Sequence, residues 1–135
     1  MKNSRGLRNR NPGNIRCSGT RYKGEIIPSQ DPAFKQFETI AWGYRALFVL
    51  LHSYRKRHGL QTIRQWITRY APPVENHTEA YITAVAREAG IAPDAPVDTA
   101  DRQQMIPIVA AMSRIENGVP AVAAEVEAGW ELYLK

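Results

Sequence analysis

The sequence predicts a mainly α protein of the α+β class, with a minor β-ribbon near the N-terminus. From residue 40 onward, apolar residues recur at the spacing of one helix face, whereas residues 1–37 are rich in glycine, proline, asparagine, serine and charge. The first pattern is typical of amphipathic helices and the second of turns and short strands. The length of 135 residues suits a single domain over residues 1–135.

The ribbon is expected within the first of these regions. Three short segments, 15–17, 22–27 and 33–37, carry apolar or aromatic residues that suit strands. Turn-forming residues punctuate the same stretch, namely Gly19, Gly24 and Pro28. We therefore expect a small ribbon that occupies little of the fold.

The longest helix is expected between Thr39 and Gly59. Its apolar face consists of residues at helical spacing: Ile40, Tyr44, Leu47, Phe48, Leu51 and Tyr54. Thr39 suits the N-cap, because its hydroxyl can accept a hydrogen bond from a free amide of the first turn. The basic run at 55–58 suits the negative end of the helix dipole, and Gly59 suits the C-terminus.

Further helical segments follow, each bounded by a capping residue, a glycine or a proline. They are expected at 63–69 between Thr62 and Pro72-Pro73, at 78–89 before Gly90, at 106–116 before Gly118, and from Pro120 to near Tyr133. Asp98 can cap a short turn that reaches Gln104. Because proline inside a helix loses a backbone hydrogen bond, we expect the helix that contains Pro107 to start near it.

The composition argues against several classes of function. The single cysteine, Cys17, cannot form an internal disulfide. No apolar stretch follows the basic N-terminus and no run approaches the roughly 20 residues of a membrane span, so neither a secretory signal nor stable membrane insertion is expected. The histidines share no metal-binding motif and no glycine-rich phosphate loop occurs, so no metal and no cofactor are expected.

The formal net charge of +5 suits a polyanionic partner. Nucleic acid, an anionic membrane surface and a cell wall rich in carboxylates and phosphates all fit this charge. A basic cluster could contact nucleic-acid phosphates, and it comprises Arg5, Arg8, Arg10, Arg16, Arg21 and Lys23 together with 55–57. Because no recognition-helix pattern accompanies the cluster, no nucleic-acid partner is expected.

A candidate acid lies at the end of the helix predicted at 106–116. The stretch 113–120 reads Ser-Arg-Ile-Glu-Asn-Gly-Val-Pro and places Glu116 in the last turn, next to an apolar face. The negative end of the helix dipole and apolar neighbours both disfavour an ionised carboxylate, so we expect a raised pKa for Glu116. A general acid in glycoside cleavage needs such a carboxyl group. The alternative is an exposed glutamate at a frayed helix end.

The asparagine-rich segment 8–16 contains Asn11, Asn14 and Arg16 around a Pro-Gly pair. Asparagine side chains bond nearby backbone groups in tight turns, which would make the segment purely structural. Amide side chains also donate and accept hydrogen bonds, as the wall of a sugar-binding cleft must. Both interpretations are open from the sequence.

The segment 70–81 contains Tyr70, Glu75, Asn76 and Tyr81 around the start of the helix predicted at 78–89. Asn76 or Thr78 can cap that helix, and a carboxylate at position 75 gains from its dipole. Such capping would account for these residues without any contact to a substrate. The alternative is that these side chains contact a substrate.

The residues around Glu116 resemble the helix-end signature of lytic transglycosylases and goose-type lysozymes. In that family an apolar helix ends in a glutamate, which is the catalytic acid, and a glycine and a proline follow shortly. The turn at 11–14, the aromatic pair Phe34 and Phe37 and the Gly-Tyr-Arg-Ala sequence at 43–46 resemble the core of bacterial glucosaminidases related to lysozyme.

The whole chain resembles small phage virion and prophage proteins. These carry the same Asn-Pro-Gly-Asn turn, the Ala-Pro-Pro-x-Glu-Asn-x-Thr segment found here at 71–78, and a terminal Glu-Asn-Gly. In the usual family order the acidic helix precedes the hairpin, whereas here Glu116 comes near the end. The resemblance therefore implies a single lysozyme-like domain with circularly permuted elements.

The resemblance implies cleavage of peptidoglycan glycan strands, by a lytic transglycosylase or a muramidase, with Glu116 as the acid. A muramidase needs a second carboxylate, for which Glu25 in the middle of the ribbon is preferred to Asp31. Trp42 is a further aromatic candidate for sugar contacts. The residues expected to bind substrate are Asn11, Asn14, Arg16, Tyr22, Tyr70, Glu75, Asn76 and Tyr81.

The expected partner is peptidoglycan, with other virion or secretion components as further partners. The sequence predicts synthesis in the cytoplasm without a signal peptide, followed by delivery to the periplasm or cell wall by phage or secretion machinery. The alternative function is that of a non-catalytic phage structural or wall-binding protein of the same fold.

Overall fold

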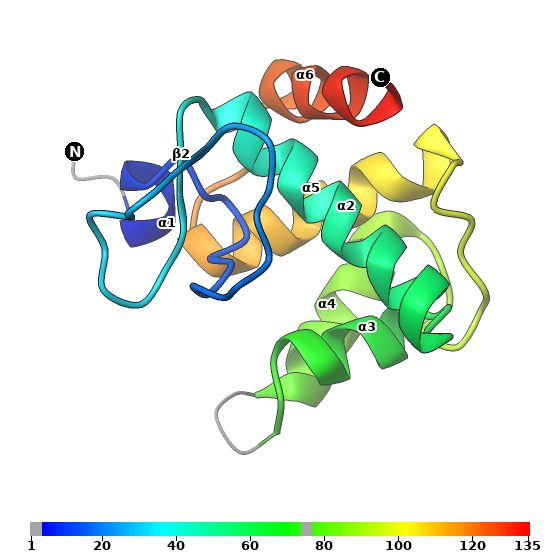
Figure 1. Cartoon of the computed structure of the whole chain (residues 1–135). Coiled ribbons are helices and arrows are strands. Elements are labelled where there is room, and N and C mark those ends of the chain that lie inside the picture. The colour runs from blue at the N-terminus through cyan, green and yellow to red at the C-terminus, as the bar shows by residue number, and fades with distance from the viewer. Residues whose placement is uncertain (1–3, 74–76) are drawn as a thin grey trace.

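The computed structural model describes residues 4–73 and 77–135 and shows a helical body with a small ribbon along one side (Figure 1). In chain order the elements are α1 (Arg5–Arg8), β1 (Glu25–Ile26), β2 (Gln36–Phe37), α2 (Ile40–His58), α3 (Ile63–Tyr70), α4 (Thr78–Ala89), α5 (Arg102–Asn117) and α6 (Ala123–Leu134). This architecture confirms the mainly α class with a small antiparallel sheet near the N-terminus.

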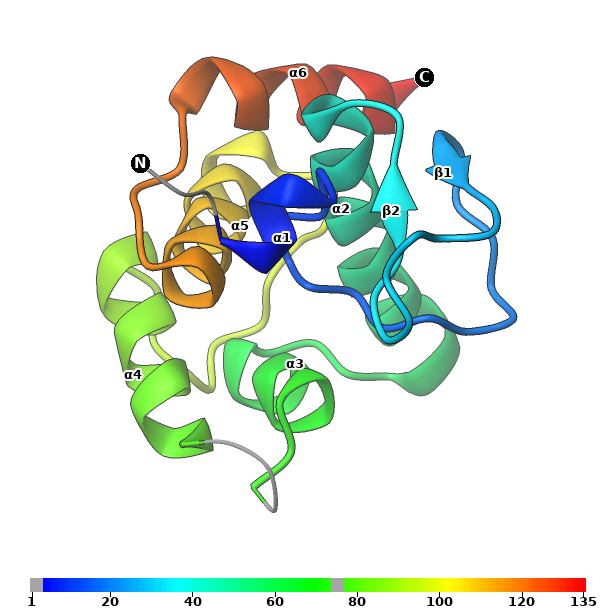
Figure 2. The ribbon, with the colours of Figure 1, turned by 90° about the vertical axis from the view of Figure 1, so that its left-hand side faces the viewer.

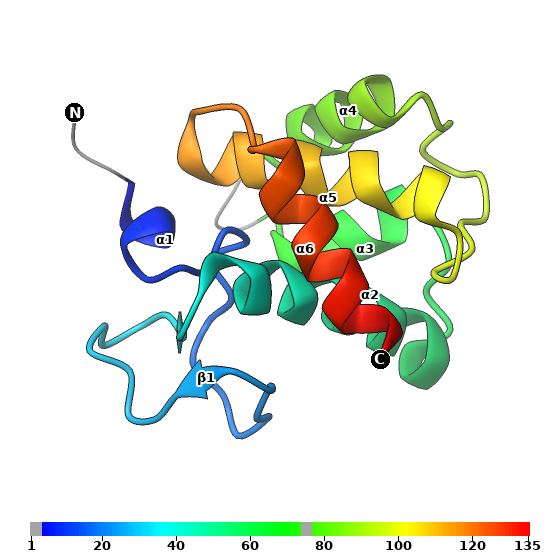
Figure 3. The ribbon, with the colours of Figure 1, turned by 90° about the horizontal axis from the view of Figure 1, so that it is seen from above.

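Helix α2 runs through the middle of the molecule and begins and ends where the sequence predicts. The hydroxyl of Thr39 accepts a hydrogen bond from the amide of Trp42 at 3.2 Å, and Gly59 ends the helix with a left-handed φ of 66°. Helix α6 lies across α2 (Figure 3), and the two helices meet at Gly129. A Cβ atom at position 129 would lie 2.4 Å from the Cβ of Tyr44, so this crossing requires glycine.

Helices α3 and α4 pack together, and α4 also packs beside α5 (Figure 2). Thr62 and Gln65 form a capping box at the start of α3, as each side chain accepts a hydrogen bond from the backbone of the other. Helix α4 has the predicted bounds, but the residue at its N-cap position is His77, which makes no side-chain cap. The hydroxyl of Thr78 donates to the carbonyl of Ala71 instead, so the expectation that it caps α4 is wrong.

Helix α5 is longer than predicted and includes the last part of the turn expected from Asp98 to Gln104. It runs continuously through Pro107, and the carboxylate of Asp101 caps it by accepting a hydrogen bond from the amide of Gln103 at 2.9 Å. Met105 and Ile108 are both fully buried, on either side of the proline. Burial of this uninterrupted apolar face offsets the backbone hydrogen bond that the proline cannot make.

The structure differs from the sequence-based expectation at two other helix starts. Pro120 lies before α6, which begins only after Val122, instead of occupying its first turn. Helix α1 forms within a segment expected to consist of turns and strands. Its N-cap, Ser4, accepts a hydrogen bond from the amide of Leu7 at 3.2 Å and so supplies one of the contacts that a very short helix needs.

The ribbon is smaller than the three predicted segments. Strands β1 and β2 pair in antiparallel register, with Glu25 opposite Phe37. The segment 15–17 adds a single bridge, between Arg16 and Phe34. The ribbon packs on α2 through a second small core, in which Phe37 is fully buried.

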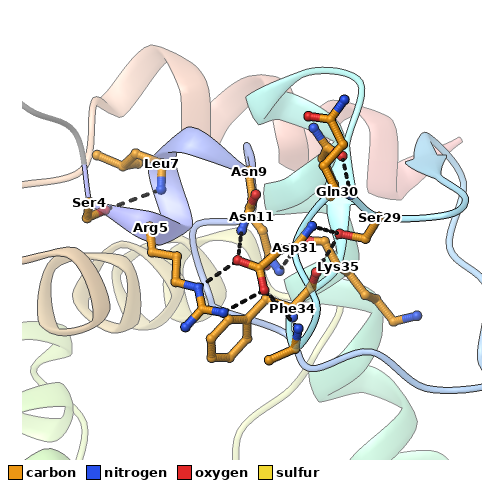
Figure 4. Close-up of polar contacts among 12 residues, drawn as sticks. Ser4, Arg5, Leu7, Asn9, Asn11, Ser29, Gln30, Asp31, Phe34 and Lys35 are labelled. Atoms are coloured by element: carbon orange, nitrogen blue, oxygen red, sulfur yellow. Dashed lines mark hydrogen bonds and ion pairs between the residues drawn. The ribbon is translucent and has the colours of Figure 1, made fainter.

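Asp31 holds the loop between the two strands in place (Figure 4). Its carboxylate accepts hydrogen bonds from the guanidinium of Arg5 at 2.6 and 2.7 Å and from the side-chain amide of Asn9 at 3.1 Å. The backbone amides of Ala33 and Phe34 donate to it as well. The loop is thereby tied to α1 and to the residue that follows it.

The main core lies between α2, α3, α4, α5 and α6. The ring of Phe48 packs edge-on against that of Trp130, with the centroids 5.1 Å apart. The hydroxyls of Tyr44 and Ser113 share a buried hydrogen bond of 2.8 Å, which joins α2 to the C-terminal part of α5. This contact fixes the end of α5, where Glu116 lies.

Candidate active site

Glu116 lies in the last turn of α5 and is held by two side chains from distant parts of the chain. The side-chain amide of Asn14 donates a hydrogen bond to Oε1 at 2.9 Å, and the hydroxyl of Tyr81 donates to Oε2 at 2.9 Å. Asn14 lies in the N-terminal turn and Tyr81 on α4. Both carboxyl oxygens are therefore fixed by neutral donors.

Burial controls the protonation of Glu116. Loss of water around the carboxyl group is the largest influence, and it raises the pKa above the ordinary glutamate value of 4.5. The hydrogen bonds from Asn14 and Tyr81, and the positive charge of Arg16, lower the pKa but do not outweigh burial. The carboxyl group thus keeps its proton over a wider pH range than an exposed glutamate, as a general acid requires.

Asn117 anchors the N-terminal segment to the end of α5. Its side-chain amide donates hydrogen bonds to the carbonyls of Pro12 at 2.8 Å and Ser113 at 2.9 Å, and its oxygen accepts one from the hydroxyl of Ser4. Figure 2 shows α1 in front of the C-terminal part of α5. The neighbour of Glu116 in sequence therefore positions the turn that carries Asn14.

A cavity of about 420 Å³ opens in front of Glu116. It lies between the N-terminal segment, α2 and the end of α3. The described residues that line it are Asn14, Ile15, Arg16, Ser18, Thr20, Tyr22, Phe34, Leu50, Tyr54, Arg69, Tyr70, Ala71 and Glu116. Of the residues that the sequence assigns to substrate binding, Asn14, Arg16, Tyr22 and Tyr70 are brought together here with Glu116.

A second hollow, of about 330 Å³, lies on the other side of Glu116. Helix α4 and the end of α5 form it, and its lining comprises His77, Ala80, Tyr81, Ala84, Ile115 and Glu116. The larger cavity carries polar and basic side chains, whereas this hollow is largely apolar. The carboxyl group of Glu116 therefore borders two spaces of different character.

Two buried polar atoms beside Glu116 have no hydrogen-bond partner within residues 4–73 and 77–135. They are the hydroxyl of Tyr70 and Oδ1 of Asn14, and both residues line the larger cavity. A buried polar group without a partner costs about 1–3 kcal/mol.

Glu25 does not line the cavity, so the expectation that it faces a cleft is wrong. Its Oε2 accepts a hydrogen bond from Nζ of Lys35 at 3.0 Å, and its Oε1 accepts one from the amide of Tyr22. Both charged side chains of this ion pair are buried, at 1% and 7% exposure. Asp31, the other candidate, is engaged by Arg5, whose hydrogen bonds hold its pKa well below the ordinary range.

Asn11 has a structural role, which decides between the two interpretations of that residue. It is fully buried, and its amide donates hydrogen bonds to the carbonyls of Ile15 and Lys35, while its oxygen accepts one from the amide of Ile15. Every polar atom of the side chain is used inside the protein. The expected substrate contact is therefore wrong for Asn11, although Asn14 in the same turn reaches Glu116.

The other expected sugar contacts have separate outcomes. Trp42 packs over Gly24 and beside Arg45 and is absent from the lining of both spaces. Tyr22 lines the larger cavity, and burial raises its pKa to about 12. Glu75 and Asn76 lie outside the described residues.

Among the lining residues that the sequence analysis did not assign to the site, Tyr54 and Arg69 stand out. Arg69 and Tyr54 contact each other, with the guanidinium carbon 5.3 Å from the ring centroid, and both face the cavity. In the sequence, Tyr54 belongs to the apolar face of a helix and Arg69 ends another helix, so both match ordinary structural roles. Their position beside Glu116 depends on how α2 and α3 cross, which local patterns do not encode.

The described parts of the chain contain no cluster of three or more His, Cys, Asp or Glu side chains suited to a metal ion. In the same parts, no helix combines the length and apolar character needed to cross a bilayer.

Comparison with known proteins places the chain in a phage family. No family model matches it. The chain is similar to protein P5 of Pseudoalteromonas phage PM2, with 38% identity over 133 residues, which cover 95% of this chain and 81% of P5. The chain belongs to the same family as this phage protein. The match extends through both the N-terminal turn and the end of α5, because it covers nearly the whole chain.

Proposed function

We propose that the protein cleaves the glycan strands of peptidoglycan, with Glu116 as the general acid. The observation that carries the proposal is the setting of the Glu116 carboxyl group. It is buried enough for a raised pKa, held at both oxygens by neutral donors, and bordered by a cavity of about 420 Å³. Glycosidases place their acid in such an environment.

In the first step Glu116 donates its proton to the oxygen that links N-acetylmuramic acid to N-acetylglucosamine. The bond from C1 to that oxygen breaks, the electron pair stays on the oxygen, and positive charge develops at C1. Asn14 and Tyr81 hold the carboxyl group in one orientation throughout. Their hydrogen bonds also stabilise the carboxylate that remains after the proton has left.

The single-acid route requires only what the described residues supply. In this route the Glu116 carboxylate takes the proton from a hydroxyl of the same muramic acid, and that hydroxyl closes on C1 to give an anhydro sugar. Among the described residues that line the cavity, Glu116 is the sole carboxylate. Hydrolysis would need a second carboxylate, either as the base that activates water or as the nucleophile at C1, and Glu25 is paired with Lys35. We therefore favour a lytic transglycosylase over a muramidase.

The spatial arrangement supports the lysozyme-like interpretation. In the family that the sequence resembles, the acidic helix leads into the hairpin. Here the end of α5 packs against the N-terminal segment that leads into the ribbon, through Asn117 and Asn14. The two parts are therefore neighbours in space although they are distant in sequence, as a circularly permuted order requires.

The relationship to a phage protein supports a role at the bacterial wall. A phage must breach peptidoglycan on entry or exit, so an enzyme of this kind would act in the periplasm or wall after delivery with other phage components. The same relationship also fits the alternative function, a non-catalytic virion or wall-binding protein.

The test is digestion of purified peptidoglycan by the wild type, Glu116→Gln and the control Glu131→Gln, which removes an exposed carboxylate on α6. We expect clearing by the wild type and the control but not by Glu116→Gln. Mass spectrometry of the products separates the two reactions, because anhydro products are lighter than hydrolysis products by one water. If no variant clears the wall but all co-sediment with it, the wall-binding alternative replaces the enzyme.

A further inference from the structure

The larger cavity beside Glu116 has a basic wall. Arg16, from the segment before the ribbon, and Arg69, from the last turn of α3, both line it. Glu116 is the one acidic residue among the described residues of the lining. With Glu116 protonated, this lining carries positive charge that an anionic group in the cavity would neutralise.

Both arginines lie over aromatic rings. The guanidinium carbon of Arg69 lies 5.3 Å from the ring centroid of Tyr54, and that of Arg16 lies 5.4 Å from that of Phe34. Contact with a ring restricts the positions that a guanidinium group can take, and planar guanidinium groups bind carboxylates through parallel N–H donors. Within residues 4–73 and 77–135, no ion pair joins Arg69 to a carboxylate.

The space on the other side of Glu116 has the opposite character. Ala80, Ala84 and Ile115 contribute apolar surface to it, and neither arginine reaches it. A neutral sugar with an acetyl methyl group suits such a surface. The two sides of Glu116 therefore differ in charge and polarity.

We propose that the larger cavity is a subsite for the carboxylates of the peptide stem on N-acetylmuramic acid, bound by Arg16 and Arg69. The inference rests on the proposed function, because it assigns an occupant to the space beside the catalytic carboxyl group. The muramic acid carries its stem as a substituent, and free carboxylates lie on that stem. The neutral N-acetylglucosamine then occupies the apolar side, which sets the direction of the strand across Glu116.

The arrangement also couples recognition to chemistry. The positive charge of Arg16 acts on Glu116 and lowers its pKa. A carboxylate bound at Arg16 offsets that charge, so an occupied subsite favours the protonated acid more than an empty one does. A strand without stem carboxylates lacks this effect.

The test is equilibrium binding by calorimetry in the Glu116→Gln background, which prevents cleavage. The probes are a peptidoglycan tetrasaccharide with free stem carboxylates and the same molecule with those groups converted to carboxamides. Arg69→Gln and Arg16→Gln are compared with Arg87→Gln, which removes an exposed charge on α4 away from both spaces. Thermal unfolding of each variant verifies that the fold is intact.

We expect Arg69→Gln and Arg16→Gln each to weaken binding of the acidic probe about tenfold, because each removes charge-assisted hydrogen bonds. Binding of the carboxamide probe should change little, and Arg87→Gln should change neither. Equal losses for both probes, no loss for the acidic probe, or no binding of either probe would overturn the subsite. If the wild type fails to cleave peptidoglycan but the charge-dependent difference persists, only the proposed cleavage fails.

Discussion

The protein contains two polar networks built around carboxyl groups, one at the ribbon and one at the end of α5, and they differ in the charge of their partners. At the ribbon, Asp31 is bound by Arg5 and Glu25 by Lys35, so each carboxylate meets a cation. At the end of α5, Glu116 is bound by the neutral side chains of Asn14 and Tyr81. Hydrogen bonds from Arg5 lower the pKa of Asp31, whereas burial raises that of Glu116.

The comparison shows that the partners of a carboxyl group determine its role within one fold. A carboxylate paired with a cation holds two chain segments together, as Asp31 does with Arg5 and Glu25 with Lys35. The buried carboxyl group of Glu116, with its neutral donors, keeps its proton to higher pH than an exposed glutamate, and it borders the cavity proposed to bind substrate. The ribbon network therefore supports the fold, whereas the α5 network is the site at which we propose the chemistry takes place.

The largest expected effect is the loss of activity in Glu116→Gln. A positioned general acid contributes about 10²–10⁴-fold to a rate, and glutamine cannot donate the proton. The release of soluble fragments from peptidoglycan should fall by about that factor, with an unchanged circular-dichroism spectrum. A rate within a few-fold of the wild type would place the proton donor elsewhere.

The second prediction concerns the ribbon network. Glu25→Gln removes one partner of a buried ion pair and leaves Lys35 without its counter-charge. Such a loss costs about 3–5 kcal/mol of folding free energy. Chemical denaturation should show this loss, while the folded fraction should cleave peptidoglycan at the wild-type rate. A stable Glu25→Gln protein without activity would restore Glu25 as a catalytic residue.

The third prediction tests the neutral donors of the α5 network. Tyr81→Phe removes the hydrogen bond to Oε2 of Glu116, a bond that stabilises the ionised form. The pKa of Glu116 should therefore rise further, and the rate should fall by about tenfold or less, because one hydrogen bond is lost. The pH–rate profile should shift to higher pH. A shift to lower pH would mean that Tyr81 favours the protonated acid.

The smallest expected effects are on stability, and they have opposite signs at the two networks. Because the folded-state pKa of Glu116 is raised above 4.5, the folded protein holds its proton longer than the unfolded chain, and stability falls as pH rises through that range. Glu116→Gln should therefore melt at a higher temperature than the wild type at pH 7, and the two should converge below about pH 4.

Asp31→Asn should show the reverse dependence. The folded-state pKa of Asp31 lies below its ordinary value of 3.8, so its stabilising contribution is present above that pH and is lost as the pH falls below it. The variant should melt at a lower temperature than the wild type at pH 7, with a difference that shrinks in acid. The melting temperatures of both variants and the wild type should be measured over the same pH series. If the difference from the wild type varied with pH in the same way for both variants, the division into two kinds of network would be refuted.

Local patterns in the sequence were sufficient to predict most of the helices. The caps at Thr39 and Thr62 and the left-handed glycines at 59 and 90 follow from rules that concern a few adjacent residues. The prediction was wrong at Pro107, where tertiary burial outweighed a local penalty. Helix α1 was missed because its contacts with the ribbon, through Arg5 and Asp31, come from outside the segment.

The candidate site was predictable only in part. The position of Glu116 at the end of an apolar helix predicted a raised pKa. In the structure the pKa of Glu116 is raised, and burial is the main cause. Which asparagine reaches Glu116 was not predictable, because Asn11 and Asn14 share one turn and only the packing against Asn117 separates them. The same holds for Arg69, whose place in the cavity depends on helix crossing.

The most direct measurement is a titration of the Glu116 side chain by carbon-13 NMR, with Glu116→Gln used to assign the carboxyl signal. The account predicts a pKa for Glu116 above the ordinary value of 4.5 and a further rise in Tyr81→Phe. A pKa at or below 4.5 would contradict it, because a carboxyl group that ionises like one in water could not serve as the acid of this site.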